Sequence, residues 1–327
     1  MNIIRRRFPV CYKDSMNMDK SFPAFVKYAL FAAGILALCA SAVAAPVEPQ
    51  SFPSPELAAN ALADAAHNND AAALLTIFGS AGQPLVNSGD KVEDAGMRAR
   101  FAERYATAHK ILVDSANKAI LVVGTEEWPF PIPLVRKHGT WHFDAAAGAE
   151  EILNRRVGRN ELDAMQVCRD YVRAQRDFAA DRQDEHKPLE YAQKFISSPG
   201  QHDGLYWPAD PGEKQSPIGP EMAHARAQGY SSNPAEEGRA PYHGYYYRIL
   251  TRQGPAAPGG ARDYLVDGHM THGFALIAFP ATWGDSGVMT FIISQNGIVY
   301  QKNLGPETAK IASAITAFNP DLSWRTR

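Results

Sequence analysis

The segment with the clearest potential for chemistry holds two histidines three residues apart. His269 and His272 follow Asp267, and glycines flank the segment. Neutral imidazole is a favoured ligand of zinc and copper. In an extended chain, however, positions i and i+3 point to opposite faces, so a metal site would require a turn here. We therefore predict ligand-binding loop histidines, His269 and His272, and assign no metal and no cofactor.

A tyrosine-rich stretch and a nearby tryptophan form a second group of candidate residues. Tyr245 and Tyr247 are two residues apart, and Trp283 follows later in the chain. Residues two apart on a strand share one face. Aromatic side chains offer large, rigid contact area for glycans or peptides. We predict Tyr245, Tyr247 and Trp283 as ligand-binding residues and assign no catalytic residue.

The tetrapeptide 284–287, Gly-Asp-Ser-Gly, is similar to the nucleophile loop of serine proteases. The similarity ends at Val288, where a further glycine is expected, and no histidine motif precedes it in the right context. A catalytic triad is defined by the geometry of three groups, which four residues cannot supply. The tetrapeptide therefore predicts a turn.

The N-terminal segment has the pattern of an export signal. Lys20 and Lys27 precede an apolar run of about 13 residues, followed by small residues at Ala42 and Ala44. A run of this length is typical of a signal peptide, whereas a membrane span needs about 20 residues. We predict a signal peptide over residues 1–44, cleaved near Ala44. The protein would then be periplasmic or secreted, with no membrane span after cleavage.

Three alternatives concern this segment. It could be retained as an anchor, Cys39 could carry a lipid, or translation could start at Met16 or Met18. Cleavage would leave Cys168 as the sole cysteine and exclude an internal disulfide, so stability must come from packing.

Composition excludes several classes of protein. The chain has 327 residues, of which 45% are hydrophobic and 21% charged, which is typical of a globular protein. Loss of residues 1–44 removes six basic and two acidic residues and changes the formal net charge from −2 to −6. A general nucleic-acid binder needs a basic face, so we expect no nucleic-acid partner.

The periodicity of the chain predicts an α+β fold in two domains, 45–158 and 159–327. In the first, Ser54 caps a helix that begins at Pro55, Asp70 caps a second helix, and a further helical stripe covers 97–108. Strands follow at 119–123, 130–135 and 140–143, and residues 137–139 predict a hairpin turn between the last two. Helices are then expected over 144–157 and 160–186. Residues 199–260 hold 9 of the 23 prolines and 10 of the 25 glycines, which indicates ordered loops over the second domain.

The last third predicts an antiparallel sheet. Strand-like runs cover 243–250, 273–279, 288–294 and 298–302, and Asn296-Gly297 is a strong hairpin signal. A final helix is expected from Pro306 to about Asn319.

Several stretches together resemble one bacterial exported family, domain of unknown function 2950. They are Gly139–Asp144, Gly148–Glu161, Tyr171–Phe178, Gly244–Leu250, Ser286–Ile293 and Lys302–Gly305. The resemblance covers about Ser51 to Trp324 and implies export but no chemistry. Residues 54–157 also resemble the nuclear-transport-factor-two-like cone, with helices and a curved antiparallel sheet. Residues 160–305 resemble pilin-like domains, with a long helix and an antiparallel sheet.

These observations favour a non-catalytic cell-envelope binding or assembly module. Its partner would be another envelope protein or a glycan or peptide ligand. The alternative is a periplasmic hydrolase, which could be metal-assisted, that uses the loop from Asp267 to His272.

Overall fold

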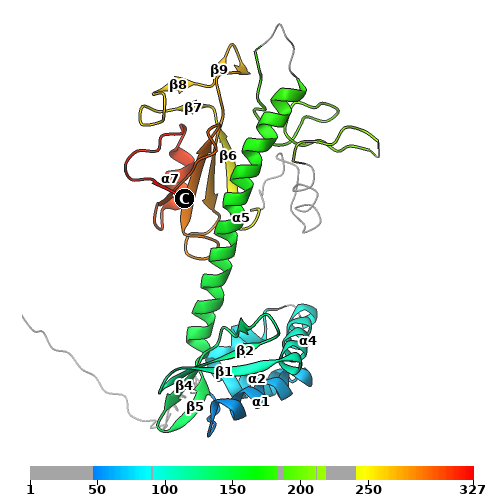
Figure 1. Cartoon of the computed structure of the whole chain (residues 1–327), viewed down its shortest axis with the longest axis vertical. Helices are drawn as coiled ribbons and strands as arrows, with labels where there is room; N and C mark the ends of the chain where they lie inside the picture. The colour runs from blue at the N-terminus through cyan, green and yellow to red at the C-terminus, as the bar shows by residue number, and fades with distance from the viewer. Residues whose placement is uncertain (1–46, 90, 183–187, 211, 219–240) are drawn as a thin grey trace, which may run out of the picture. The chain divides into compact units, whose positions relative to one another are not determined.

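The computed structural model describes residues 47–89, 91–182, 188–210, 212–218 and 241–327. It is a mixed α+β structure with antiparallel sheets, as the sequence predicts (Figure 1). The predicted signal peptide lies outside these residues. Among the helices of the described ranges, none has both the length and the apolar character that crossing a bilayer requires.

The first half begins with helices whose starts are set by side-chain caps. Ser54 accepts a hydrogen bond from the Leu57 N–H at 3.3 Å, and Asp70 accepts one from the Ala73 N–H at 2.9 Å. These caps satisfy amides that have no partner within the helix. The helical elements are α1 (Pro55–His67), α2 (Ala71–Phe78), the 3-10 turn η1 (Ser80–Gly82), α3 (Gln83–Val86) and α4 (Lys91–Thr107).

The helices are followed by an antiparallel sheet. Its strands are β1 (His109–Ser115), β2 (Lys118–Val123), β3 (Trp128–Pro129), β4 (Leu134–Lys137) and β5 (Thr140–Phe143). The order is β1-β2-β4-β5, with β3 paired to β2. The predicted strand over 130–135 is wrong in its bounds: ordered pairing skips the prolines at 131 and 133, which lack the N–H that a ladder needs.

A two-residue turn joins β4 to β5, as predicted. His138 and Gly139 have φ of 51° and 86°, the left-handed values that a type I′ hairpin turn requires at both central positions. Trp141 and Phe143 of β5 contribute to the core of this half, and Phe143 meets Phe78 edge to face at 5.5 Å. The turn therefore fixes which side chains of β5 face the core and which face away from it.

Helix α5 (Ala145–Asp181) runs without interruption for 37 residues. The sequence predicts two helices instead, because Gly158 and Asn160 are typical of a helix end and a helix start. The prediction of a break is wrong. Gly158 is absent from the residues with positive φ, and the Asn160 amide donates to the Ser286 carbonyl at 2.9 Å instead of capping its own helix.

The second half forms a sheet with the order β14 (Arg325–Thr326), β13 (Val299–Asn303), β12 (Met289–Ser294), β11 (Ala275–Pro280) and β6 (Tyr245–Leu250). Asn296-Gly297 joins β12 to β13 as predicted, with the Gly297 N–H donating to the Ser294 carbonyl at 2.9 Å. The other elements are β7 (Arg252–Gln253), β8 (Arg262–Asp263), β9 (Leu265–Val266), β10 (His269–Met270) and α7 (Thr308–Ala314).

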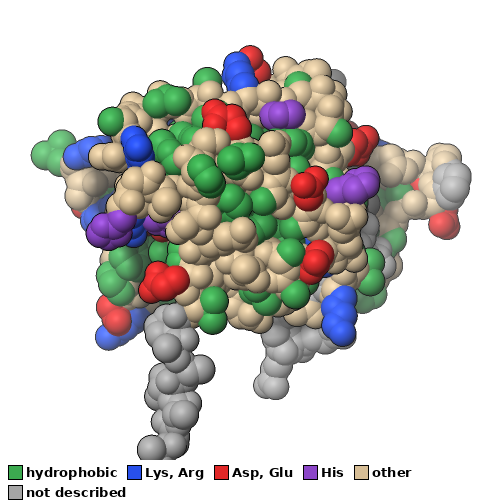
Figure 2. Space-filling model, turned by 90° about the horizontal axis from the view of Figure 1, so that it is seen from below, with side chains coloured by type: hydrophobic (Ala, Val, Ile, Leu, Met, Phe, Trp, Pro, Cys, Tyr) green, Lys and Arg blue, Asp and Glu red, His purple; other side chains and the backbone are tan. Residues whose placement is uncertain are grey.

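Residues 164–179 of α5 pack on this sheet and form a second core with it (Figure 1). From the loop-rich stretch, Tyr206 and Trp207 are buried in the same core, which supports ordered loops there. Met222 and Tyr230 of the same stretch lie outside the described residues. On the face shown in Figure 2, acidic, basic and histidine side chains are interspersed among hydrophobic ones, and neither charge gathers into a large patch.

The final helix is shorter than predicted. Helix α7 ends at Ala314, because the Arg248 guanidinium takes the carbonyls of Ala312 and Ile315 at 2.8 and 2.6 Å. The chain then extends, and the Phe318 N–H donates to the Arg252 carbonyl at 3.0 Å. The side chain of Arg248, on β6, thus supplies the hydrogen bonds that a further helical turn would have made to these carbonyls.

Two glycines of α5 give a matched test of this helix. A Cβ at Gly158 would meet nothing within 4 Å, whereas one at Gly148 would lie 2.6 Å from Cγ1 of Ile132. We expect Gly158→Ala to raise the free energy of unfolding by about 0.5–1 kcal/mol through helix propensity. Gly148→Ala should lower it by about 1–3 kcal/mol through overpacking. Urea denaturation measures both, and a destabilising Gly158→Ala would contradict an uninterrupted helix.

Candidate functional site

The two predicted tyrosines lie on β6 and are engaged in packing. Tyr245 is fully buried, and its hydroxyl donates to the Met289 carbonyl at 2.9 Å. The Tyr247 hydroxyl donates to the Tyr242 carbonyl at 3.4 Å. Burial raises the pKa of both phenols well above the usual value, so both stay protonated. Tyr245 therefore offers no surface to a ligand.

The other three predicted residues have separate partners. His269 Nδ1 lies 2.9 Å from a Glu190 carboxylate oxygen, and His272 Nδ1 lies 2.9 Å from the hydroxyl of its neighbour Thr271. Trp283 Nε1 donates to Asn303 at 2.9 Å. Within the described residues no hydrogen bond or ring contact joins any two of the five predicted residues, and no group of three metal-ligating side chains forms.

The tetrapeptide 284–287 is a turn, as predicted. The Gly284 N–H donates to the Gly287 carbonyl at 2.9 Å. The Ser286 hydroxyl accepts from the Thr282 N–H at 2.9 Å and donates to the Thr282 carbonyl at 3.1 Å. Its hydroxyl thus closes the turn.

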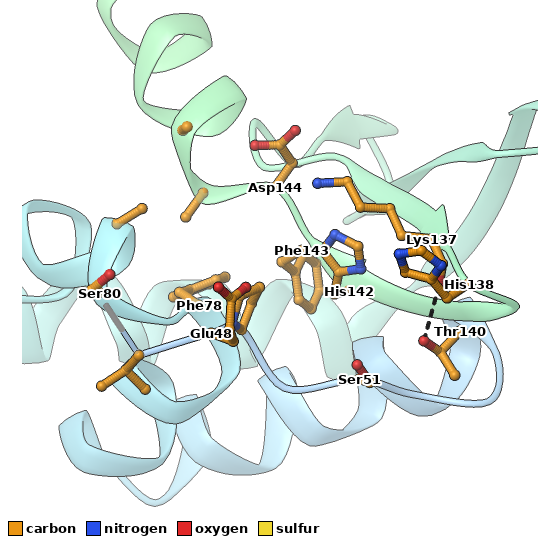
Figure 3. A pocket seen from close by; sticks show the side chains of 15 residues that line it. Glu48, Ser51, Phe78, Ser80, Lys137, His138, Thr140, His142, Phe143 and Asp144 are labelled. Atoms are coloured by element: carbon orange, nitrogen blue, oxygen red, sulfur yellow. Dashed lines mark hydrogen bonds between the residues drawn. The ribbon is translucent and has the colours of Figure 1, made fainter. Parts of the chain in front are cut away.

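The first half contains a pocket that the sequence analysis missed. It has a volume of about 570 Å³ and lies where β4, β5, the start of α5 and the segment before α1 meet (Figure 3). The polar side chains of its lining are those of Glu48, Ser51, Ser80, Lys137, His138, Thr140, His142 and Asp144. The apolar residues of its lining are Val47, Pro49, Phe78, Ala81, Phe143, Ala145 and Ala146.

His142 is the central residue of this pocket. Its side chain is only 8% exposed, and it forms no hydrogen bond within the described part of the chain. Burial lowers the pKa of His142, and the Lys137 ammonium lowers it further, against the opposing effects of the Asp144 and Glu48 carboxylates. At neutral pH the ring is therefore an uncharged donor and acceptor, directed into the pocket (Figure 3).

Two oppositely charged groups flank the imidazole. Neither Lys137 nor Glu48 forms an ion pair with another described residue, and both side chains are exposed. Asp144, by contrast, is already used: it caps α5 by accepting from the Ala147 N–H at 3.1 Å. The pocket thus offers one ammonium, two carboxylates, of which that of Asp144 also caps α5, and the imidazoles of His138 and His142.

The sequence carries a weak signal for this site. Residues 140–143 are predicted as a strand, and alternation places Thr140 and His142 on one face with Trp141 and Phe143 on the other. A histidine that alternates with two aromatic core residues marks a polar position next to a core. Glu48, nearly a hundred residues away, carries no comparable signal.

Comparison with known proteins identifies the chain at the level of a family. The model of a family described as "protein of unknown function (DUF2950)" matches residues 49–326. The chain belongs to this family. The resemblance seen in the sequence is confirmed, and the match to DUF2950 includes both halves and all but two of the pocket residues, Val47 and Glu48. No curated protein and no solved structure matches the chain. The likenesses to the nuclear-transport-factor-two cone and to pilins, like the domain boundary at 158, stay predictions.

The lowered pKa of His142 predicts a pH-dependent stability. In the folded state the ring binds a proton less readily than in the unfolded state, whose pKa is close to 6.5. The unfolded state therefore takes up more protons as the pH falls below about 6.5, and stability decreases there. His142→Gln should reduce this slope between pH 7.5 and 5 in urea denaturation. Equal slopes in wild type and His142→Gln would contradict the assignment.

Proposed function

We propose that this protein is a non-catalytic binding module of the bacterial cell envelope that holds a small zwitterionic ligand, such as the end of a peptide, in the pocket around His142. One observation carries the proposal: the imidazole of His142, which has no hydrogen-bond partner in the described chain, points into a pocket that the Lys137 ammonium and the Glu48 carboxylate also line. Because its ring nitrogens are open to the pocket, a bound ligand can accept a hydrogen bond from one nitrogen and donate to the other.

The charges around the imidazole define the ligand class. The Lys137 ammonium fits a carboxylate, and the Glu48 carboxylate fits an amine. A ligand with only one of these charges would leave the other pocket charge without a partner. The hydroxyls of Ser51 and Thr140 add further polar contacts. An amino acid or a short peptide with free ends matches this set.

The envelope location is supported by the sequence. The positive segment, the apolar run and the small residues at Ala42 and Ala44 follow the order of an export signal. The chain beyond residue 44 keeps one cysteine, Cys168, which is fully buried. Such a chain folds without a disulfide and so tolerates an oxidising compartment.

Binding can be tested with the dipeptide alanyl-alanine by calorimetry. We expect the form with free ends to bind, and the N-acetylated and C-amidated forms to bind about tenfold to a hundredfold more weakly, the range of one charge-assisted hydrogen bond. Lys137→Met should abolish the preference for the free carboxylate only. Glu48→Gln should abolish the preference for the free amine only.

Arg136→Met is the matched control, because Arg136 precedes Lys137 on β4 and does not line the pocket. It should bind like the wild type. Absence of binding for the free dipeptide and for free alanine would contradict the zwitterion proposal. Equal losses for all three peptide forms in Lys137→Met would contradict the role of Lys137.

Export can be tested independently of the ligand. Expression of the full chain in a bacterial host should give a periplasmic or secreted product whose first residue is Ala45. Ala42→Lys places a long charged side chain at the −3 position of the predicted site, and the larger precursor should accumulate. Val43→Lys, which lies outside the apolar run, keeps the added charge but leaves the residues at both small positions, Ala42 and Ala44, intact. An unprocessed wild-type chain in the cytoplasm would contradict the envelope location.

A further inference from the structure

The outermost strand of the first sheet has an open edge. Strand β1 pairs with β2 on one side, whereas β3 and β4 both lie on the far side of β2. No described residue pairs with the outer edge of β1. An open edge presents a row of unpaired N–H and C=O groups to other chains.

The side chains of this strand are unusually exposed for an apolar run. Leu112 is 47% exposed and Val113 is 70% exposed. The strand contains no proline, whereas it has two other features that protect edge strands, the charged Lys110 and a bulge between Val113 and Ser115. Its charged residues, Lys110 and Asp114, are four positions apart and opposite in sign.

The ladder shows which backbone groups point outward. The Gly124 N–H donates to the Ala108 carbonyl at 2.8 Å, in register with the pairing of β1 and β2. Because bonds alternate along an antiparallel ladder, Lys110 and Leu112 bond to β2. Ile111 and Val113 then direct their N–H and C=O groups to the open edge.

We propose that β1 pairs with β1 of a second copy of this chain, antiparallel and centred on Leu112. In this register Ile111 lies opposite Val113 of the second copy, so the outward-directed backbone groups of both copies meet. Leu112 faces its own counterpart. Lys110 lies opposite Asp114 at both ends, where Asp114 is the bulge residue that directly follows the regular ladder of His109–Val113. The strand is therefore complementary to itself in charge as well as in hydrogen bonding.

The ion pairs that Lys110 and Asp114 form within their own chain are compatible with this pairing of two copies. Lys110 pairs with Glu127, and Asp114 pairs with Lys118 at 3.2 Å, all with side chains about half exposed or more. Exposed pairs of this kind contribute little, so exchanging partners costs little. A seven-residue strand offers less than the roughly 800 Å² per partner of a standard interface. The dimer is therefore weak and forms reversibly with concentration.

A charge exchange across the two copies tests the register. In Lys110→Asp all four facing charges are negative, and in Asp114→Lys all four are positive, so each variant alone should remain a monomer. In an equimolar mixture, a strand with two negative charges can pair with a strand with two positive ones, and opposite charges then face each other at both ends. Sedimentation velocity of the purified protein should show dimers for the wild type at high concentration, none for either variant, and dimers again for the mixture.

Both variants lose one ion pair within their own chain, and mixing does not restore it. Recovery in the mixture therefore reports contact between copies, and thermal unfolding of each variant confirms that it is folded. Lys302→Asp, on β13 of the other sheet, is the control for a change of charge and should dimerise like the wild type. A wild type that stays monomeric at all concentrations, or a mixture that fails to recover the dimer, overturns the proposal.

Discussion

The uninterrupted hydrogen-bonded backbone of α5 is the constraint on which both cores depend. Its first residue, Ala145, belongs to the core of the first half, and residues 164–179 form one side of the core of the second. A helix of ordinary length packs in one core, and a break at Gly158 would have divided α5 into two such helices. Polar contacts hold the middle of the helix: Glu161 accepts from the Val288 and Met289 N–H groups at 3.0 Å each.

The pocket follows from the same constraint. The hairpin turn at His138 and Gly139 sets the phase of β5, and Asp144 ends the strand and caps α5 in one residue. Because only Asp144 lies between β5 and α5, the alternation of β5 places Thr140 and His142 on the face away from the aromatic core. The direction of the imidazole into the pocket is then a consequence of local geometry.

Sequence patterns predicted what depends on local physics. The cap at Ser54, the turn at Asn296-Gly297 and the α+β class rest on neighbouring residues and are confirmed. The sequence patterns gave wrong helix ends where residues distant in the chain determine the structure. Asn160 bonds to Ser286 instead of capping a helix, and Arg248 ends α7 early. Strand β1 was missed because an exposed edge has no alternating burial. The pocket was missed because Glu48 and His142 meet only through the fold.

The buried thiol of Cys168 can report how often the second core opens. Burial raises the pKa of this thiol to about 12, so the reactive thiolate is almost absent while the protein is folded. Modification must wait for the core to open, and the rate of labelling then measures how often it opens. In an oxidising compartment the same feature keeps the folded chain out of disulfide exchange with its neighbours. A chain that has begun to unfold exposes the thiol, which can then form a disulfide with another thiol. The thiol of a folded chain stays buried and does not react.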